Sequence, residues 1–279
     1  SAKCWQVAAM ASWQALADEA RLWADSGRSG VVWWRDDDAV DVGPALERLL
    51  AIRQKWAVPL ALAVVPAQAT AALAARLREA PDVDVLQHGY AHVNHAAASE
   101  NRKMELGLHR PAMMVLGELG TGWLALERLF GARALAVMVP PWNRIAPTLI
   151  PTLPEIGFKG LSTFGPRRRP RPVRGLLEIN THVDLIDWKG SRGFPGEAAA
   201  LGALVSALTT ARAASPPASA EPVGVLSHHL AMDGEGWDFL RSLLERAAML
   251  PGLRISSARA LFTSETVSTS SLVTGEANG

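Results

Sequence analysis

Two histidines in the stretch QHGYAHVNH carry a spacing that suits metal binding. His88 and His92 are four residues apart, and on a helical turn that spacing puts both imidazoles on one face, with roughly 5–6 Å between their Cβ atoms. Two ring nitrogens then reach one zinc ion at about 2.0–2.1 Å. The alternative is a polar helix start with surface histidines. His95 lies one turn further along and is a spare ligand or a neighbour of the ligands.

Three consecutive carboxylates, Asp36, Asp37 and Asp38, follow the apolar run GVVWW. Adjacent carboxylates repel one another, and a cation among them relieves the repulsion, so that one can act as a ligand and another as a base. The competing interpretation is a solvated turn before a helix that opens at Pro44. One carboxylate with two histidines makes an open metal site in which water takes a further position.

Further groups with acid–base character occur near the C-terminal end of the chain. His228 and His229 end the apolar run VGVL, and an imidazole opposite a metal site can act as a general acid. Asp184 and Asp187, in DLIDW, can orient such a histidine. Trp188 can line a groove, because aromatic faces stack on sugar rings, although most tryptophans are core residues. The arginine run RRRPRPVR (167–174) is typical of a solvated loop.

Short apolar runs alternate with helical patterns and must position these groups. The predicted strands are Gly30–Trp34, Leu60–Val65, Val83–Leu86, Ala134–Val139, Lys159–Thr163, Leu176–Asn180 and Val223–Leu226, with a further short piece at Leu253–Ile255. The predicted helices cover 44–55, 68–80, 97–130, 147–156, 197–214 and 236–249. Most strands are continuous apolar runs, as expected for parallel strands that are covered on both faces. The 97–130 segment is long for one helix, and its glycines 117, 120 and 122 predict a break.

Seven strands with helical crossovers predict a (β/α) barrel or a doubly wound sheet. In both architectures ligands bind beyond the carboxyl ends of the strands. The polar clusters obey this rule. RDDD follows the first strand, QHGYAHVNH the third, PPWN the fourth, HVDLIDW the sixth and SHH the seventh. We therefore expect the clusters to meet in one site.

Size and composition favour one folded domain over residues 1–262 with a flexible tail at 263–279. The net charge of +1 gives no field that would attract nucleic acid, and the single cysteine excludes an internal disulfide.

The uncharged stretch from Trp56 to Ala75 is interrupted by two prolines, which favours a strand, a turn and a helix over a membrane span. The N-terminus carries Trp and Gln where a signal peptide needs apolar residues, so we expect a cytoplasmic protein. Residue 1 is not Met, which leaves a removed leader open, and the oligomeric state is open too.

The five clusters, in this order, resemble the motifs of the polysaccharide deacetylase superfamily, the family 4 carbohydrate esterases. That family carries a TFDDG-like motif, then H-[ST]-x-x-H, R-x-P-[YW], D-x-x-D-W and L-x-H. The counterparts here are RDDDA (35–39), HGYAH (88–92), VPPW (139–142), DLIDW (184–188) and LSH (226–228). The resemblance covers residues 30–230 and implies a distorted (β/α)7 barrel with its active site at the C-terminal ends of the strands.

The resemblance also implies roles for individual residues. Asp38, His88 and His92 would hold a divalent metal, most readily Zn²⁺, and Asp37 would be the base that deprotonates the metal-bound water. His228 would protonate the departing amine while Asp184 or Asp187 holds its ring, and a backbone N–H near Trp142 would help to stabilise the oxyanion. The residues expected to contact substrate are Tyr90, Trp142, Asn143, Arg144, Trp188 and His229.

Several positions depart from the family pattern. Val139 stands where the family has the Arg that pairs with the catalytic base, and Arg35 or Arg144 are the candidates to replace it. Gly89 replaces the Ser/Thr of the second motif, and Ala39 replaces the glycine of the first. The triple Asp leaves the register open, because Asp36 and Asp37 can stand in for Asp37 and Asp38. A divergent branch is indicated.

Three functions are compatible with these residues. The leading hypothesis is metal-dependent hydrolysis of an N-acetyl or O-acetyl group on a sugar or polysaccharide, with a small molecule or an oligosaccharide as the partner. The second keeps the chemistry on a non-sugar amide or cyclic amide. The third is a carbohydrate-binding pseudoenzyme, which the missing third-motif Arg favours and the retained acid–base residues oppose.

Overall fold

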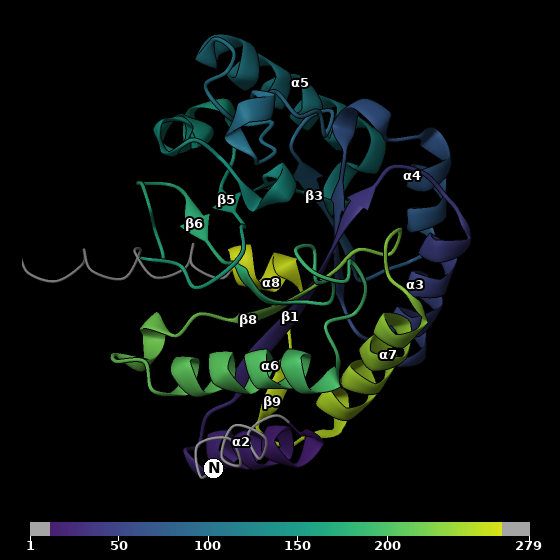
Figure 1. The fold of residues 1–279 in the computed structure, drawn as a ribbon, viewed down its shortest axis with the longest axis vertical. Helices are drawn as coiled ribbons and strands as arrows, with labels where there is room; N and C mark the ends of the chain where they lie inside the picture. The colour runs from purple at the N-terminus through teal and green to yellow at the C-terminus, as the bar shows by residue number, and fades with distance from the viewer. Residues whose placement is uncertain (1–11, 264–279) are drawn as a thin grey trace, which may run out of the picture.

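Nine parallel strands form one curved sheet in the computed structural model, which describes residues 12–263 (Figure 1). The strand order is β6-β5-β4-β3-β2-β1-β8-β7, and β9 pairs with β1. The strands are β1 Gly30–Ala39, β2 Leu60–Val64, β3 Val83–His88, β4 Ala134–Val139, β5 Gly160–Leu161, β6 Leu177–Glu178, β7 Thr181–Asp184, β8 Val223–Ser227 and β9 Leu253–Ile255. Near the two ends of this order, the N–H of Thr181 donates to the carbonyl of Thr163 just beyond β5 (3.0 Å), so the sheet curls into a distorted barrel. The predicted fold class is confirmed.

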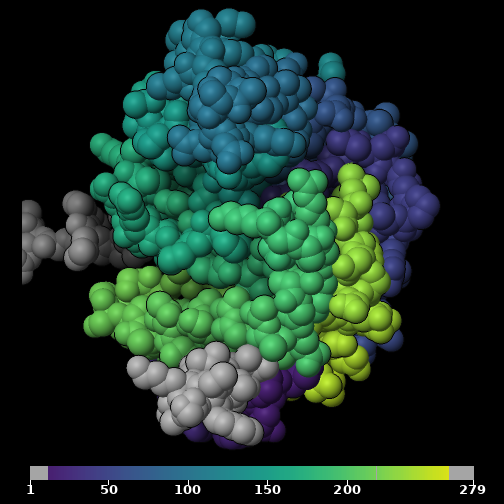
Figure 2. All heavy atoms as spheres, in the orientation of Figure 1, coloured from purple at the N-terminus to yellow at the C-terminus, as the bar shows by residue number. Residues whose placement is uncertain are grey.

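Most helices cover the outside of the sheet, whereas Leu261 and Phe262 near the C-terminal end of the described chain pack against the cluster that contains Trp33. The α-helices are α2 Trp13–Asp25, α3 Pro44–Lys55, α4 Ala71–Arg78, α5 Ala112–Phe130, α6 Glu197–Arg212, α7 Gly234–Met249 and α8 Ala258–Thr263. The 3₁₀ segments are η1 Pro66–Gln68, η2 Ala98–Glu100, η3 Gly131–Arg133, η4 Pro141–Asn143, η5 Pro147–Ile156 and η6 Pro217–Ser219. In the space-filling view α6 crosses the lower half of the molecule, and the segments around residues 97–130 form the upper end of the molecule (Figure 2). No helix within residues 12–263 is long and apolar enough to cross a membrane.

Strand β1 shows how the core is divided. Its side chains alternate between the two faces of the sheet, as in any strand. Trp33 belongs to a cluster inside the barrel with Ala61 and Leu86, whereas Trp34 belongs to the larger cluster between the sheet and the outer helices. Both indoles are almost completely buried. The alternation continues past the apolar run, so that the side chain of Arg35 follows Trp33 towards the barrel interior.

The strand predictions needed two main corrections. Strand β1 runs on to Ala39 and includes all three aspartates, because the barrel gives these carboxylates polar partners. Strand β7 was missed, and the HVD of HVDLIDW lies in it and not after the sixth strand. Its burial alternates, with Thr181 and Val183 buried and His182 and Asp184 only partly so, which breaks the continuous apolar pattern.

The helix predictions hold best where the apolar periodicity is regular, as in α3. The expected break at the glycines of 97–130 is wrong, because α5 runs unbroken through all three of them and begins after Pro111. The residues before it form loops around η2. The 147–156 segment is 3₁₀ and not α-helical, with Pro151 and Pro154 inside it. Helix α2 was not predicted. Of the predicted tail at 263–279, Thr263 is the last residue of α8, and residues 264–279 lie outside the described residues.

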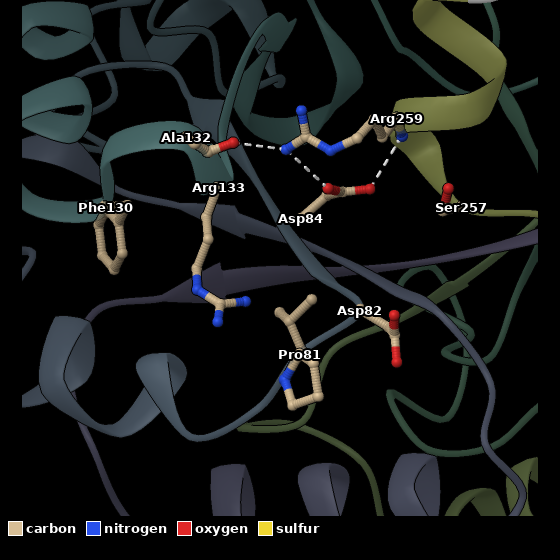
Figure 3. Close-up of a pocket in the computed structure, with 9 residues that line it drawn as sticks. Pro81, Asp82, Asp84, Phe130, Ala132, Arg133, Ser257 and Arg259 are labelled. Carbon is tan, nitrogen blue, oxygen red and sulfur yellow. Dashed lines mark hydrogen bonds and ion pairs between the residues drawn. The ribbon is translucent and has the colours of Figure 1, made fainter.

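A cavity of about 690 Å³ lies at the amino ends of the strands, opposite to the polar clusters (Figure 3). Its charged groups are paired with their neighbours. The backbone N–H of Arg259 donates to Asp84 (2.8 Å) and its guanidinium to the same carboxylate (3.1 Å), while Arg133 donates to the carbonyls of Ala80 and Arg78. None of the predicted site residues lines this cavity.

Candidate metal and acid–base site

An irregularity in β1 brings two adjacent aspartates to the same site. The pairing of β1 with β2 shifts register between Asp36 and Ala39, and Asp38 has a φ of 72°. In a regular strand neighbouring side chains point to opposite faces, but a bulge re-aims one of them. Asp38 therefore faces His88 at the end of β3 and His92 in the loop after it, although its neighbour Asp37 already points towards the barrel interior. Each of the three aspartates has its own environment.

Asp38, His88 and His92 form a group that can hold a metal ion. One ligand atom from each lies within 4.8 Å of the other two. The Nε2 atoms of His88 and His92 are 3.0 and 3.2 Å from Oδ1 of Asp38. Burial would raise the pKa of Asp38, but the hydrogen bonds from the two histidines outweigh it and hold the pKa well below its usual range. Burial lowers the pKa of His88, and the nearby Asp37 and Asp38 carboxylates outweigh that effect and raise it.

The ring of His88 has the orientation that a metal ligand requires. Its Nδ1 lies 3.0 Å from the carbonyl oxygen of Val139, which can only accept a hydrogen bond. The ring therefore carries an N–H on Nδ1, while Nε2 lies 3.0 Å from the Asp38 carboxylate and would present a lone pair to a metal once that nitrogen gives up its proton. Metal-binding histidines are typically held by such a second hydrogen bond. Two imidazoles and one carboxylate are also the ligands of open catalytic zinc sites, so the residues present fit a divalent metal.

The helical turn predicted for His88 and His92 is wrong. His88 is the last residue of β3, and the residues after it form a loop in which Gly89 and His92 have φ values of 56° and 59°. The left-handed residues turn the chain back on itself, so the two rings still come to 5.1 Å between centroids. The ring of Trp142 lies 4.5 Å from that of His92. His95 is not part of the metal-binding group.

Asp37 is held by Arg35, two residues earlier on the same face of β1. The guanidinium donates to both carboxylate oxygens, at 2.8 and 3.0 Å, and both side chains are almost completely buried. The same guanidinium donates to Oγ of Ser162 (2.7 Å) and to Oδ1 of Asn143 (2.7 Å). Of the two candidates named from the sequence, Arg35 is the one that pairs with Asp37. The other candidate, Arg144, donates to the carbonyl of Lys103 instead.

Asp36 is buried on the outer side of β1, away from the metal group. Its carboxylate lies 2.5 Å from Nδ1 of His229 and accepts hydrogen bonds from the His229 N–H (3.0 Å) and from Oγ of Ser227 (2.5 Å). Trp34 donates to the same Ser227 hydroxyl (2.8 Å). Burial lowers the pKa of His229, and the Asp36 carboxylate outweighs that effect and raises it. This network joins the ends of β1 and β8; a contact of His229 with substrate stays a prediction.

His228 lies near Asp184 and Trp188. Its Nδ1 is 3.9 Å from Oδ1 of Asp184 and, among residues 12–263, this buried nitrogen has no hydrogen-bond partner. The indole of Trp188 donates to the other oxygen of Asp184 (3.0 Å) and stands edge-on to the His228 ring, with 4.9 Å between centroids. Burial raises the pKa of Asp184. Hydrogen bonds of catalytic groups are often long before substrate binds, so this arrangement suits an acid oriented by a carboxylate.

Other predicted residues take positions beside the site. Asp187 was an alternative to Asp184, but its carboxylate accepts from the N–H groups of Gly190 and Ser191 in a turn. Asp184 is therefore the aspartate that faces His228. Tyr90 packs its ring partly against an apolar cluster that includes Leu106. The predicted substrate contacts of Tyr90, Trp142, Asn143, Arg144 and Trp188 stay predictions.

Two buried polar residues of this region were missed from the sequence. Ser162 follows β5 and bonds to Arg35, and Glu105 accepts backbone hydrogen bonds from the loop between His88 and His92. Ser162 sits at the end of a predicted strand, which was an available signal. Glu105 lies in a loop with no periodic pattern, and nothing in the sequence separates it from a solvated glutamate.

The backbone of the site is held in an unusual conformation. The positive-φ residues other than glycine include Asp38, His92, Trp142 and Asn143, with φ values between 55° and 72°. Asn adopts this region readily, but for a bulky residue such as Trp it is an outlier that the surrounding structure must impose. Such residues concentrate at functional sites, which agrees with the placement of the acid–base groups.

Comparison with known proteins finds similarity in structure only. No protein-family model matches the chain, and no curated protein sequence matches it either. A CE4 esterase from Streptococcus mutans matches with a TM-score of 0.54 at 15% identity, covering 86% of this chain and 90% of that one. The Xyl-CE4 domain of a multidomain xylanase from the hindgut metagenome of Trinervitermes trinervoides matches with a TM-score of 0.52 at 12% identity (84% and 90% covered). A peptidoglycan N-acetylglucosamine deacetylase matches with a TM-score of 0.51 at 15% identity (84% and 88%).

These matches define the class of fold. The protein shares the distorted barrel fold of these deacetylase and esterase structures, and each of the three is covered over most of its length. The resemblance that the five motifs predicted is confirmed at the level of the fold. At 12–15% identity the chain stands far from these proteins in sequence, as the departures in its motifs indicate.

Proposed function

We propose that the protein is a metal-dependent hydrolase that removes an N-acetyl or O-acetyl group from a sugar. One observation carries the proposal: the Asp38–His88–His92 group lies beside Asp37, a buried carboxylate that Arg35 orients. Ligands and base thus come from one end of the same barrel. The pseudoenzyme hypothesis loses its main support, because Arg35 pairs with Asp37 and so fills the role of the missing third-motif Arg.

The chain's own residues can divide the reaction among them. Asp38, His88 and His92 would hold a divalent ion, which would supply a Lewis acid able to polarise a carbonyl and to lower the pKa of water. Asp37 takes a proton from the attacking water, since each of its oxygens keeps a lone pair beyond the bond to Arg35. His228 delivers a proton to the leaving nitrogen or oxygen, and Asp184 stabilises the charged ring.

The sugar substrate is the less specific part of the proposal. A fold can host many activities, so the printed names of the matching deacetylases and esterases support the substrate class by analogy alone. The partly exposed Trp188 beside His228, and Trp142 beside His92, offer aromatic faces on which a sugar ring can stack.

Metal content and acetate release test the proposal together. We expect the purified protein to take up about one Zn²⁺ or Co²⁺ per chain, as three ligands in one group imply. It should then release acetate from acetylated amino sugars or acetylated xylose oligomers. Asp37→Asn should abolish turnover and leave metal binding intact. Asp41→Asn, on an exposed residue of the following loop, is the matched control and should behave as the unmodified protein.

The outcomes separate the alternatives. Protein that binds no divalent metal, or that turns over equally well with Asp37→Asn, would contradict the proposed chemistry. Metal binding without acetate release, combined with hydrolysis of a small cyclic amide, would move the substrate to a non-sugar amide. Metal-independent sugar binding without turnover would support the pseudoenzyme.

A further inference from the structure

A short segment crosses the loop that joins the two metal-binding histidines. We call residues 103–106 the crossing segment. Glu105 in this segment is 1% exposed, and its carboxylate accepts the backbone N–H of Tyr90 (3.2 Å) and of Ala91 (2.8 Å). These two residues lie between His88 and His92. A carboxylate rarely becomes buried unless it is paired, and here the backbone of the metal-binding loop provides donors.

Gly89 and Glu105 are matched in shape. A Cβ added at Gly89 would lie 2.1 Å from Oε2 of Glu105 and 2.6 Å from the ring of Pro141. Gly89 also has a φ of 56°, a region that favours glycine. The buried carboxylate therefore occupies the space that a Ser or Thr side chain would need at this position. This accounts in physical terms for the departure of HGYAH from the H-[ST]-x-x-H pattern.

The crossing segment also binds the metal-binding loop by its backbone. The N–H of His95 donates to the carbonyl of Met104 (2.9 Å), and the N–H of Met104 donates to Oδ1 of Asn94 (2.8 Å). The sequence left the role of His95 open, and the structure shows that its backbone N–H bonds to the crossing segment. The crossing segment thus contacts the chain between His88 and His92 and again just after His92.

The other side of the crossing segment contacts the loop that carries Trp142. The N–H of Ala146 donates to the carbonyl of Leu106 (2.8 Å), and Arg144 donates to the carbonyl of Lys103 (2.9 Å). The crossing segment therefore lies between the two loops and bonds to both. Glu105 is its only charged side chain that is buried among the described residues of 103–106.

We propose that Glu105 is a positioning residue of the metal site, an inference that rests on the proposed metal-dependent function. It orders the backbone between His88 and His92 so that both Nε2 atoms face Asp38. Since the two imidazoles come from a strand end and from a loop, their convergence depends on the shape of that loop. Outer hydrogen bonds of this kind typically change metal affinity by about 10–100-fold when they are removed.

The test measures metal affinity in the full chain by competition with a chelator, using Zn²⁺ and Co²⁺. We expect Glu105→Ala to weaken binding by about 10–100-fold. Glu105→Gln keeps the size and one acceptor oxygen and should lose less. Glu100→Gln is the matched control, because Glu100 also accepts a backbone N–H, from Ala97, but is exposed. It should stay within about twofold of the unmodified protein, as is usual for surface substitutions.

A second variant keeps the test sharp if Glu105→Ala is poorly stable. Gly89→Ala should weaken metal binding in the native background, because its Cβ would collide with the carboxylate. In the Glu105→Ala background that collision is gone, so the added loss should be smaller. Non-additivity of this kind is expected for residues in direct contact. The visible spectrum of the Co²⁺ forms reports whether the ligand geometry changes.

The outcomes are distinguishable. If the unmodified protein binds Zn²⁺ but Glu105→Ala and Glu105→Gln bind it as tightly as Glu100→Gln does, the positioning role is overturned and the proposed function stands. Unfolding midpoints that fall while metal affinity and the Co²⁺ spectrum stay unchanged would likewise overturn it, since a merely structural role predicts that result. If the unmodified protein binds no metal, both proposals fail.

Discussion

Replacing Arg35 is the most direct way to test how the base is held. Arg35→Met keeps much of the side-chain length and removes the charge. In the native protein the guanidinium makes two bonds to Asp37, in a place without solvent contact. It also donates to Oδ1 of Asn143, to the hydroxyl and carbonyl of Ser162 and to the carbonyl of Thr163. The variant leaves a buried carboxylate without its counter-charge.

The expected cost follows from that geometry. Breaking a buried ion pair by removing one partner costs about 3–5 kcal/mol. The stability of a typical domain is only about 5–15 kcal/mol, so Arg35→Met should lose a large share of it. Urea unfolding of the metal-free protein at neutral pH measures this loss as a lower midpoint with an unchanged slope. The stability of Arg35→Lys should lie between those of the native protein and Arg35→Met. Lysine keeps the positive charge, but its ammonium cannot make the paired bonds to a carboxylate.

A double variant identifies the cause. Adding Asp37→Asn to Arg35→Met removes the uncompensated charge, so the pair of substitutions should cost less than the sum of the single ones. If Arg35→Met costs less than about 1 kcal/mol, or if the two losses simply add, then the ion pair does not hold Asp37 in the way described here. Turnover by a folded, metal-loaded Arg35→Met at the native rate would refute the positioning of the base.

Further predictions concern pH and metal. Because Asp36 raises the pKa of His229, the stability that this pair contributes is fully present below about pH 6.5, the ordinary histidine value, and is lost as pH rises through the higher folded pKa. Urea midpoints of the native protein and of His229→Gln should therefore converge at alkaline pH, and a constant difference would contradict this. Trp188→Phe removes a hydrogen bond that lowers the pKa of Asp184, so the acid limb of the pH–rate profile should move to higher pH. Zn²⁺ at about 100 times its dissociation constant should stabilise the protein by about 2.7 kcal/mol in a thermal scan, and His88→Ala should abolish the effect.

The sequence predicts the barrel well because its parallel strands are covered on both faces. The apolar runs at Leu60–Val64 and Ala134–Val139 stand out for this reason and carry little ambiguity. Strand β7 was hidden because its partly exposed His182 and Asp184 interrupt the pattern. The polar clusters were placed together by the rule that ligands bind at the carboxyl ends of parallel strands.

The site was harder to predict in its details. The pairing of Arg35 with Asp37 follows from the two-residue alternation of a strand. The charged residues gave no sign that β1 continues to Ala39, because a run of charges is typical of a solvated turn. The division of labour among three adjacent aspartates depends on a bulge, which a single sequence does not reveal. Glu105 is recruited from a loop more than ten residues away, and only the folded chain shows that it faces Tyr90 and Ala91.

The left-handed backbone at Asp38, His92 and Trp142 has a consequence for how this protein can change. Each such conformation costs about 1–3 kcal/mol for a residue other than glycine, and the remainder of the barrel must compensate. Replacing Asp38 or Trp142 by glycine would relieve the strain. It would also remove a proposed metal ligand in the first case and a proposed aromatic surface for the sugar in the second. Selection for heat resistance alone would therefore tend to erase the site, a trade-off between stability and activity built into the geometry of three residues.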